Sequence, residues 1–331
     1  MEPLLLGSIL VSFFLTLFFI SFWIKGAKRV GLVGKDMNKF DKKELAESGG
    51  VGVLFGFVLG VLSYVAVKTF YFDTATNLIY TFALLSCILI IGFIGLMDDI
   101  LGWKIGLNIK TKIFLLAFAS IPLIVINSGE SNLLGIELGL VYPLILIPLG
   151  IIATSTTFNI LAGYNGLEAS QGILILSALA IITYRTSNPW LSVILLSMVA
   201  SLVAFYFFNK FPARIFPGDT LTYPVGALIA ITAILGNVEK IAVFFFIPYI
   251  IEAILKTRGK LEKESFAKVN SDGSLDEPYE KIYGLEHLAI RVLKKIKRTG
   301  KAYEKEVVFL INLFQLIIIF LGFFLFKIKL I

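Results

Sequence analysis

The sequence contains a single cysteine and a single histidine. Cys87 lies inside an apolar run, so the chain can form neither an intrachain disulfide nor a cysteine-based metal site. With only His287, multi-histidine metal chemistry is also excluded. We find no P-loop, GxGxxG or zincin motif, which excludes the enzyme classes that depend on them. Charged residues are scarce at 16%, against 57% hydrophobic residues.

Long apolar runs account for this imbalance and for the mean hydropathy of +0.89. The runs extend over roughly 17–21 residues, the length needed to cross about 30 Å of hydrocarbon. They are continuous rather than alternating, which favours helices over a barrel. We therefore predict an all-α, polytopic membrane protein forming a single domain over residues 1–331. The ten expected transmembrane helices cover 4–24, 50–67, 78–97, 112–127, 140–158, 168–184, 190–208, 220–236, 239–255 and 307–326.

The distribution of basic residues predicts the orientation of these helices. Of the 30 lysines and arginines, 25 fall in one set of alternate loops, namely 25–49, 98–112, 159–167, 209–219 and 256–306. By the positive-inside rule, this set faces the cytoplasm and both termini face outside. The first apolar run, Leu4–Ile24, has no basic segment before it and is too long for a signal peptide, so we expect it to remain as a helix. The net charge of +7 thus indicates membrane topology rather than nucleic-acid binding.

The long cytoplasmic loop 256–306 contains an amphipathic segment. Apolar residues recur there at helical spacing, and basic residues flank them: Leu285, Leu288, Ala289, Val292, Leu293 and Ile296, with Arg291, Lys294, Lys295, Lys297 and Arg298. We expect residues 285–298 to form an interfacial helix on an anionic membrane surface. A helix packed on the other cytoplasmic loops fits the pattern equally well.

Acidic residues gather on the predicted cytoplasmic face. Asp98 and Asp99 end the third span, where carboxylates are costly and usually functional. Neighbours on a helix point about 100° apart, so the two acids cannot share one role. One could face a metal and the other a lysine or a substrate. The alternative is that these acids are solvated at the end of the span and only cap a helix. Asp219 begins the eighth span, where it could simply cap the helix.

Asparagine and glycine interrupt the apolar sequence over Thr157–Ser170. Together with Asp219, Asn159 offers the hard oxygen donors that Mg²⁺ prefers. Asn165 follows six residues later, on a different helical face, and Gly163 allows a turn and close approach of a ligand. A plain connecting loop is the alternative. The sequence therefore indicates a cytoplasmic site for phosphate chemistry, with basic loops for an anionic substrate.

Four ordered motifs in this sequence resemble those of the polyprenyl-phosphate N-acetylhexosamine-1-phosphate transferases, and most closely the branch that initiates lipid-linked oligosaccharides. They are Gly34–Lys39 with Glu47–Gly50, Gly95–Asp99, Asn159–Ala169 and Phe216–Thr220. The resemblance implies transfer of GlcNAc-1-phosphate from UDP-GlcNAc to dolichyl phosphate in the membrane, with release of UMP. It also implies an archaeal cell membrane or the endoplasmic reticulum as the location. A homodimer is compatible with it.

The resemblance assigns roles to individual residues. Asp219 and Asn159 would bind Mg²⁺, for which Mn²⁺ is a substitute, and Asp98 and Asp99 would be the essential acidic pair. Lys112, placed by its spacing to Ser120 and Pro122, would contact a phosphate, with Lys104 and Lys110 as competing positions. The remaining substrate-binding residues are expected to be Lys35, Asp36, Asn38, Glu47, Gly163, Asn165, Phe216, Lys256, Arg258 and Lys260, with Phe216 stacking on uracil.

One motif of the family is missing. Its last cytoplasmic loop carries a histidine-containing basic motif, whereas residues 256–268 here hold five basic residues and no histidine. We expect His287 to be structural rather than catalytic. Another UDP-N-acetylhexosamine, or undecaprenyl phosphate as acceptor, therefore stays open as an alternative. A transporter would need acids at mid-membrane and inverted repeats, and the sequence shows neither.

Overall fold

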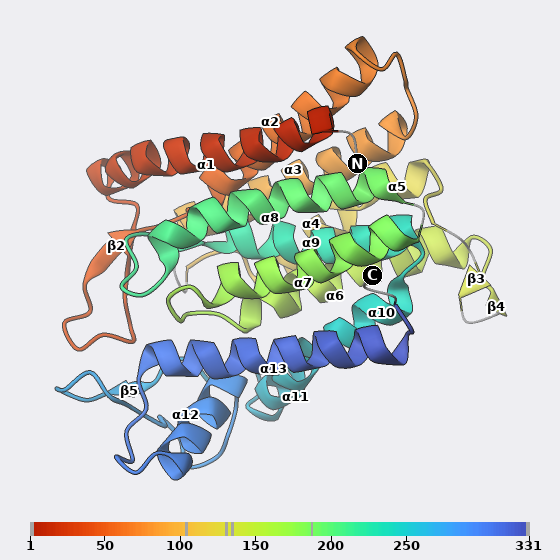
Figure 1. The fold of residues 1–331 in the computed structure, drawn as a ribbon. Coiled ribbons are helices and arrows are strands. Elements are labelled where there is room, and N and C mark those ends of the chain that lie inside the picture. Colours follow the sequence, from red (N-terminus) through yellow and green to blue (C-terminus); the bar gives the residue numbers. More distant parts are fainter. Residues whose placement is uncertain (1–2, 103–104, 130–131, 134–135, 187, 329–331) are drawn as a thin grey trace.

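A computed structural model describes residues 3–102, 105–129, 132–133, 136–186 and 188–328 as a bundle of helices (Figure 1). In this described part, eight helices are long and apolar enough to cross a membrane. They are α1 (Pro3–Val30), α2 (Gly50–Phe70), α3 (Leu78–Leu101), η1 (Tyr142–Leu146) continued by α6 (Ile147–Ile160), α7 (Leu167–Arg185), α8 (Pro189–Asn209), α9 (Asp219–Gly236) and α13 (Glu304–Leu325).

The other two predicted spans form helices that are each broken near a proline. The fourth span consists of α4 (Ile109–Ala119) and α5 (Ile121–Val125), and the ninth of α10 (Glu239–Phe245) and α11 (Ile247–Arg258). Pro122 and Pro248 lie in the first turn of the second piece, where a missing N–H is tolerated, and neither can continue the preceding helix. The prediction of an all-α polytopic membrane protein is confirmed.

Helix α9 lies at the centre of the bundle and is its most buried membrane helix among those described. It packs against α3 and α6 at two glycines. A Cβ on Gly95 would lie 2.5 Å from the carbonyl oxygen of Asp219, and one on Gly226 would lie 2.5 Å from that of Thr154. Glycine at these positions lets the backbones approach closely. The start of α9, with Asp219, is thereby held against the end of α3.

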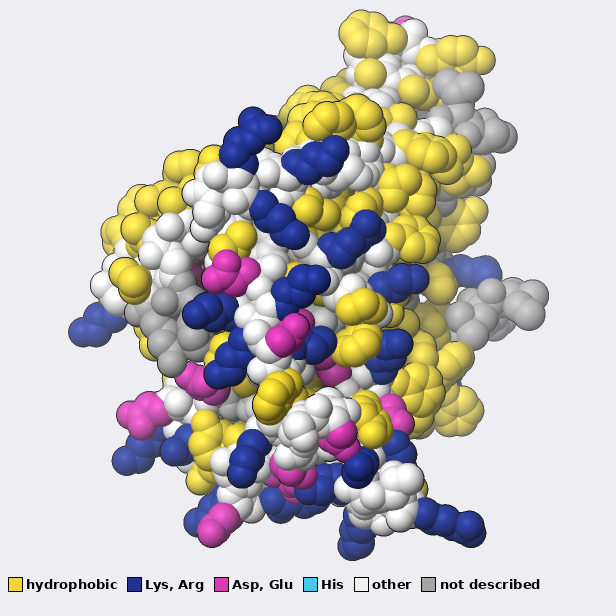
Figure 2. All heavy atoms as spheres, turned by 90° about the vertical axis from the view of Figure 1, so that its left-hand side faces the viewer, with side chains coloured by type: hydrophobic (Ala, Val, Ile, Leu, Met, Phe, Trp, Pro, Cys, Tyr) yellow, Lys and Arg dark blue, Asp and Glu magenta, His cyan; other side chains and the backbone are white. Residues whose placement is uncertain are grey.

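The two ends of the bundle differ in character. At one end lie the hairpin of β1 (Val33–Lys35) and β2 (Glu44–Ala46), the polar connections around residues 161–166 and 210–218, and the pair β5 (Lys268–Val269) and β6 (Leu275–Asp276) (Figure 1). Figure 2 shows that lysines and arginines are spread over this end, which we call the basic end. Both termini lie toward the opposite end, where β3 (Asn132–Leu133) and β4 (Ile136–Glu137) also lie (Figure 1).

The amphipathic segment forms α12 (Leu285–Ile296), which lies beside the start of α13 (Figure 1). Its first half packs on the protein, since Leu285, Ala289 and Ile290 are buried. Leu288 and Ile296 of the same helix remain exposed. The buried residues agree with a helix packed on the rest of the predicted cytoplasmic loops, and contact of the exposed apolar side chains with a membrane surface stays a prediction.

Candidate active site

Three acids and one lysine converge where α3, α4 and α9 meet at the basic end. Lys112, in the first turn of α4, places its Nζ 2.5 Å from Asp98 Oδ2 and 3.4 Å from Asp219 Oδ2. The same ammonium group lies 5.7 Å from the centre of the Tyr223 ring. A lysine between two carboxylates leaves one excess negative charge, which suits a site for a cation or for a cation-bound phosphate.

The two neighbouring acids of α3 point in different directions, as the helical geometry predicts. Asp98 accepts from Lys112 and, at 2.5 Å, from the N–H of Leu107. Asp99 instead caps α9: its carboxylate accepts from the N–H of Asp219 at 2.7 Å and from the hydroxyl of Thr220 at 2.6 Å. The Asp99 carboxylate also accepts a hydrogen bond from the backbone N–H of Thr220. An acid suits this position because the first N–H groups of a helix lack partners and carry partial positive charge. Asp99 therefore orients Asp219.

Asn159, at the end of α6, lies next to the start of α9. Its Oδ1 accepts a hydrogen bond of 2.7 Å from the hydroxyl of Thr222. Thr222 follows Asp219 by three residues, which is nearly one helical turn. The Asn159 amide is thus held by the first turn of the helix that Asp219 begins, and amide and carboxylate oxygens are both hard donors that fit Mg²⁺. No group of three or more His, Cys, Asp or Glu side chains suited to chelation occurs among the described residues. A two-ligand site completed by water and substrate phosphates is what Mg²⁺ commonly uses.

The glycine-rich turn between α6 and α7 folds back on itself through Glu168. Gly163 and Gly166 adopt φ angles of +96° and +85°, which other residues rarely tolerate. The N–H of Gly163 donates to Glu168 Oε1 at 2.7 Å. Sequence reasoning assigned no role to Glu168; in the fold its buried carboxylate holds the turn together from within.

The β1–β2 hairpin brings Glu47 and Phe216 together. Residues 46–50 run beside residues 215–217, and the N–H of Phe216 donates to the carbonyl of Ala46 at 2.8 Å. A Cβ on Gly34 would lie 2.2 Å from Glu47 Oε2 and 3.2 Å from the Phe216 ring. Glycine at this position therefore leaves room for both side chains. Burial, and then the nearby Asp99, Asp219 and Glu168 carboxylates, raise the pKa of Glu47 to about 8.

This raised pKa predicts how stability depends on pH. Folded Glu47 keeps a proton that the unfolded chain releases, so its contribution is present below pH 4.5 and is lost as the pH rises to about 8. In the absence of divalent cations, we expect the Tm of the detergent-solubilised protein to fall over this interval. Glu47→Gln should flatten the curve, because glutamine stays neutral. Glu44→Gln is the control, because Glu44 is an exposed acid three residues earlier, at the start of β2; equal slopes for the two variants would contradict the assignment.

Three basic residues at and just after the end of α11 were predicted to bind substrate, and they do not join this cluster. Lys256 is buried and donates to the Ser265 hydroxyl at 2.6 Å, with Glu252 at 3.6 Å. The Arg258 guanidinium lies 5.9 Å from the Tyr283 ring, and Lys260 is exposed. Lys35 is likewise exposed, at the end of β1. In the segment 256–268, where the family's histidine motif is missing, these basic residues thus contact other residues of the loop or face solvent.

His287 belongs to the buried base of this loop. Its side chain is 1% exposed and its ring lies 5.6 Å from that of Tyr279. Burial, together with the nearby Lys256 ammonium, lowers the pKa of His287 to about 4, so the imidazole is neutral at physiological pH. This environment agrees with a structural role.

An apolar groove of about 740 Å³ lies between α6, α9 and the α10–α11 pair, and Thr157 of its lining brings it close to this site. Its walls come from η1, α6, α9, α10 and α11, and include Leu149, Ala153, Ile229 and Phe246. Near the basic end, Thr154 and Thr157 of α6 line the groove, the latter two residues before Asn159. At the other end Tyr142 donates to Glu239 at 2.7 Å. The apolar lining of the groove suits a hydrocarbon chain.

Comparisons with known proteins agree with this arrangement. A family model described as glycosyl transferase family 4 matches residues 81–237, which include α3, α4, α6 and α9 with the acidic cluster. A protein of Saccharolobus solfataricus, provisionally named UDP-N-acetylglucosamine–dolichyl-phosphate N-acetylglucosaminephosphotransferase, is 38% identical over 92% of this chain and 91% of its own.

Two more distant relatives come from other branches of life. The UDP-N-acetylglucosamine–dolichyl-phosphate N-acetylglucosaminephosphotransferase of Dictyostelium discoideum is 29% identical over 67% of this chain and 64% of its own. The phospho-N-acetylmuramoyl-pentapeptide-transferase of Streptococcus agalactiae is 29% identical over 73% of this chain and 76% of its own. Both names describe transfer of a phosphosugar.

Proposed function

Because the chain belongs to glycosyl transferase family 4, we propose that it transfers GlcNAc-1-phosphate from UDP-GlcNAc to dolichyl or a related polyprenyl phosphate, giving GlcNAc-pyrophosphoryl lipid and UMP. This is the first step of lipid-linked oligosaccharide assembly for N-glycosylation. The observation that carries the proposal is the junction of Lys112, Asp98 and Asp219 beside an apolar groove. If the hydrocarbon chain of the lipid lies in the groove, its phosphate would lie near this cluster, where Lys112 can neutralise part of the phosphate charge.

The reaction requires little proton transfer. An oxygen of the lipid phosphate, already anionic, attacks the phosphorus that bears the sugar. The bond from that phosphorus to the bridging oxygen breaks, and UMP leaves with the electron pair. Catalysis then depends on alignment and on neutralising the crowded negative charge. Lys112 supplies a fixed cation, and Asp98 holds that cation in place. In this direct mechanism no phosphate becomes attached to Asp98; trapping a phosphorylated Asp98 in the absence of acceptor would refute it.

Asp219 and Asn159 are the residues that would hold Mg²⁺. The ion would neutralise the pyrophosphate of the donor. Asp99 keeps Asp219 at the start of α9 through its hydrogen bonds to the helix N-terminus, and Thr222 orients the Asn159 amide. Two protein ligands leave room for phosphate oxygens, as donor binding requires.

The nucleotide half of the donor would bind between the glycine-rich turn and the β1–β2 hairpin. The turn presents Gly163 and Asn165, while the hairpin side presents Glu47 and the half-buried ring of Phe216. An aromatic ring at this position can stack on uracil. Glu47, neutral at pH 7, can donate a hydrogen bond to a carbonyl group of the base.

The basic end would face the cytoplasm, with both termini outside. The positive-inside rule supports this orientation, since 25 of 30 basic residues lie in loops assigned to that side. In this orientation the site would take its donor from the cytoplasm.

The proposal is tested with membranes that contain the expressed chain, sugar-labelled UDP-GlcNAc and dolichyl phosphate. We expect labelled pyrophosphoryl lipid to form with Mg²⁺, and its formation to stop with EDTA and with tunicamycin. Parallel assays with UDP-GalNAc and with undecaprenyl phosphate determine the sugar and the lipid; the streptococcal relative makes the second worth including. If no labelled lipid forms from any pair, the proposed function is wrong. Full activity in EDTA would remove the metal from it.

A further inference from the structure

The turn that carries Gly163 and Asn165 is held by side chains from distant parts of the chain. Asn38 Nδ2 donates to the carbonyl of Gly163 at 2.8 Å. The N–H of Asn165 donates to Glu304 Oε1 at 2.7 Å, and its side-chain Nδ2 donates to Asp36 Oδ2 at 3.1 Å. These bonds span more than 120 residues each. They therefore form only in the completed fold.

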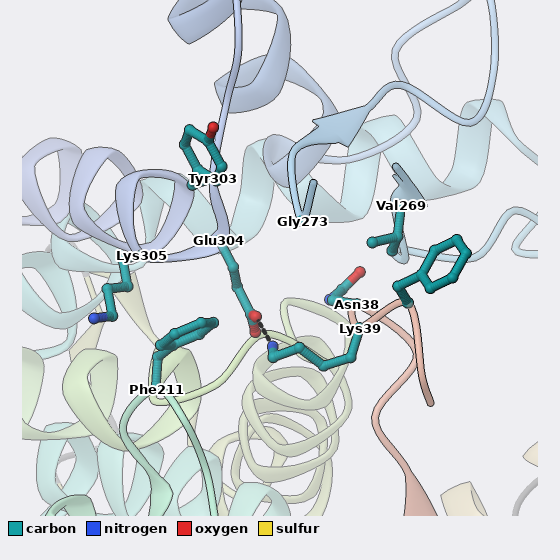
Figure 3. Close-up of a pocket in the computed structure, with 9 residues that line it drawn as sticks. Asn38, Lys39, Phe211, Val269, Gly273, Tyr303, Glu304 and Lys305 are labelled. Carbon is teal, nitrogen blue, oxygen red and sulfur yellow. Dashed lines mark hydrogen bonds and ion pairs between the residues drawn. The ribbon is translucent and has the colours of Figure 1, made fainter. Parts of the chain in front are cut away.

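Glu304 is the member of this set that α13 contributes. Its side chain is 3% exposed, and its second oxygen pairs with Lys39, as Figure 3 shows. Lys39 Nζ also lies 3.4 Å from Asp36 Oδ2, so one ammonium group connects the two carboxylates that hold Asn165. Phe211 lies beside the pair, with the ammonium 4.4 Å from its ring centre.

A glutamate in the first turn of a helix could simply cap that helix. Here a neighbour fills that role. Glu306 and Tyr303 form a capping box at the start of α13, in which the N–H of Tyr303 donates to Glu306 Oε2 at 3.0 Å. Glu304 instead turns away from its own helix and accepts from Asn165. Burying a carboxylate at this point is costly unless the bonds that it makes are needed.

Asn38 connects the same turn to the long loop before α13. Its Oδ1 accepts the N–H of Ala267 at 3.0 Å, while its Nδ2 serves Gly163. The side chain is 2% exposed, and both of its polar atoms are used by backbone groups. Asn38 is thus suited to hold the turn rather than to bind a substrate. Phe266, the residue before Ala267, covers Gly163: a Cβ on Gly163 would lie 2.8 Å from the Phe266 ring.

Asn165 shows what this support achieves. Because its Nδ2 is taken by Asp36, its Oδ1 is fixed as the atom left to accept a hydrogen bond, and this buried oxygen has no protein partner in the described part of the chain. An unpaired buried acceptor is costly, which suits an atom kept for a ligand donor such as the N–H of a uracil ring. A small shift of the turn would misplace it.

We infer that Glu304, supported by Lys39 and Asn38, is a positioning residue for the nucleotide half of the donor. The inference rests on the proposed function, because it assigns Asn165 to the nucleotide. Glu304 touches neither Lys112 nor Asp219 by any contact in the structure described, so its effect should be confined to nucleotide binding. The last transmembrane helix thereby helps to build a site whose recognisable motifs all lie before residue 221.

The test compares Glu304→Ala, Glu304→Gln and the matched control Glu306→Ala, which removes a carboxylate from the same turn of α13. We expect Glu304→Ala to raise the KM for UDP-GlcNAc and the Kd for UMP about 10-fold, the weight of one charge-assisted hydrogen bond. The KM for dolichyl phosphate and kcat should change less than about twofold. Glu304→Gln should restore most of the affinity, since its amide oxygen still accepts from Asn165. Glu306→Ala should bind UMP like the wild type.

The outcomes separate this inference from the proposed function. If the wild type makes product but Glu304→Ala binds UMP normally, the inference is wrong and the proposed function stands. If the wild type makes no product, the proposed function is wrong, and UMP affinity still decides whether Glu304 positions a nucleotide site. Loss of kcat and of both affinities together, without recovery in Glu304→Gln, would assign Glu304 a purely structural role. If Glu304→Ala is not monodisperse, Glu304→Asp, with its carboxylate one methylene shorter, decides the question.

Discussion

Replacing Asp219 by asparagine is expected to lower kcat by about 10³-fold, equivalent to about 4 kcal/mol of lost transition-state stabilisation. The substitution removes the anionic oxygen proposed to hold Mg²⁺ and leaves Lys112 with Asp98 alone. The fold should persist, because Asp99 holds this position through the backbone N–H, which asparagine retains. Turnover of the purified protein at saturating Mg²⁺ is the measurement, with size-exclusion chromatography and Tm to verify folding.

Asp41→Asn is the control for this variant. Asp41 is an exposed acid of the loop between β1 and β2, on the same end of the molecule. It should keep wild-type turnover and Mg²⁺ dependence. Folded Asp219→Asn protein that retains Mg²⁺-dependent activity would remove Asp219 from the metal site.

Replacing Lys112 by methionine is expected to lower kcat by about 10²-fold, the usual loss when one fixed charge-stabilising group is removed from a site. Methionine keeps the length of the side chain but leaves Asp98 and Asp219 facing each other without a cation between them. Repulsion between these carboxylates should also weaken donor binding, so the KM for UDP-GlcNAc should rise. Steady-state kinetics with both substrates varied measures the two effects.

Lys110→Met distinguishes Lys112 from its nearest competitor. Lys110 lies in the same turn of α4 but is exposed to solvent, so its replacement should change kcat less than about twofold. The reverse pattern, with Lys110 essential and Lys112 dispensable, would contradict the assignment. Lys104, the third lysine considered from the sequence, lies outside the described residues.

The membrane fold could be predicted from the sequence because hydrophobicity dictates it directly. Runs of apolar residues long enough to cross a bilayer must be helical, and each run appears as a helix or a proline-broken pair. The breaks at Pro122 and Pro248 were not predicted. Proline in a membrane segment can kink a helix, begin one or be tolerated, and the packing around it decides which occurs. The family resemblance read from the motifs is confirmed by the comparisons.

The acidic cluster was partly predictable. Helical geometry required Asp98 and Asp99 to have different partners, and topology placed both on the same face as Asp219 and Asn159. The partners themselves were not predictable. Asp99 was expected to be half of the essential acidic pair, but its hydrogen bonds to the start of α9 were not foreseen. Thr220 was named only as the end of a motif, and Thr222 was not considered, because hydroxyl groups are common in membrane helices, where they usually bond to their own backbone.

The support of the glycine-rich turn between α6 and α7 could not be predicted at all. Glu304 resembles an ordinary first-turn acid, and only the folded chain brings it to Asn165. Lys256 shows the opposite limit: it belongs to a basic stretch that suggested substrate binding, but the fold buries it against Ser265 and Glu252. Burial of single charged residues depends on contacts between distant segments, which local patterns do not encode.

The fate of the donor's β-phosphate tests the central claim most directly. The measurement uses UDP-GlcNAc with radioactive phosphorus at the position that bears the sugar, together with dolichyl phosphate, Mg²⁺ and the purified protein. Transfer of a sugar phosphate predicts that the label enters the lipid and that the released nucleotide is unlabelled UMP. Release of labelled UDP with an unlabelled glycolipid would show transfer of the sugar alone, and would contradict the account.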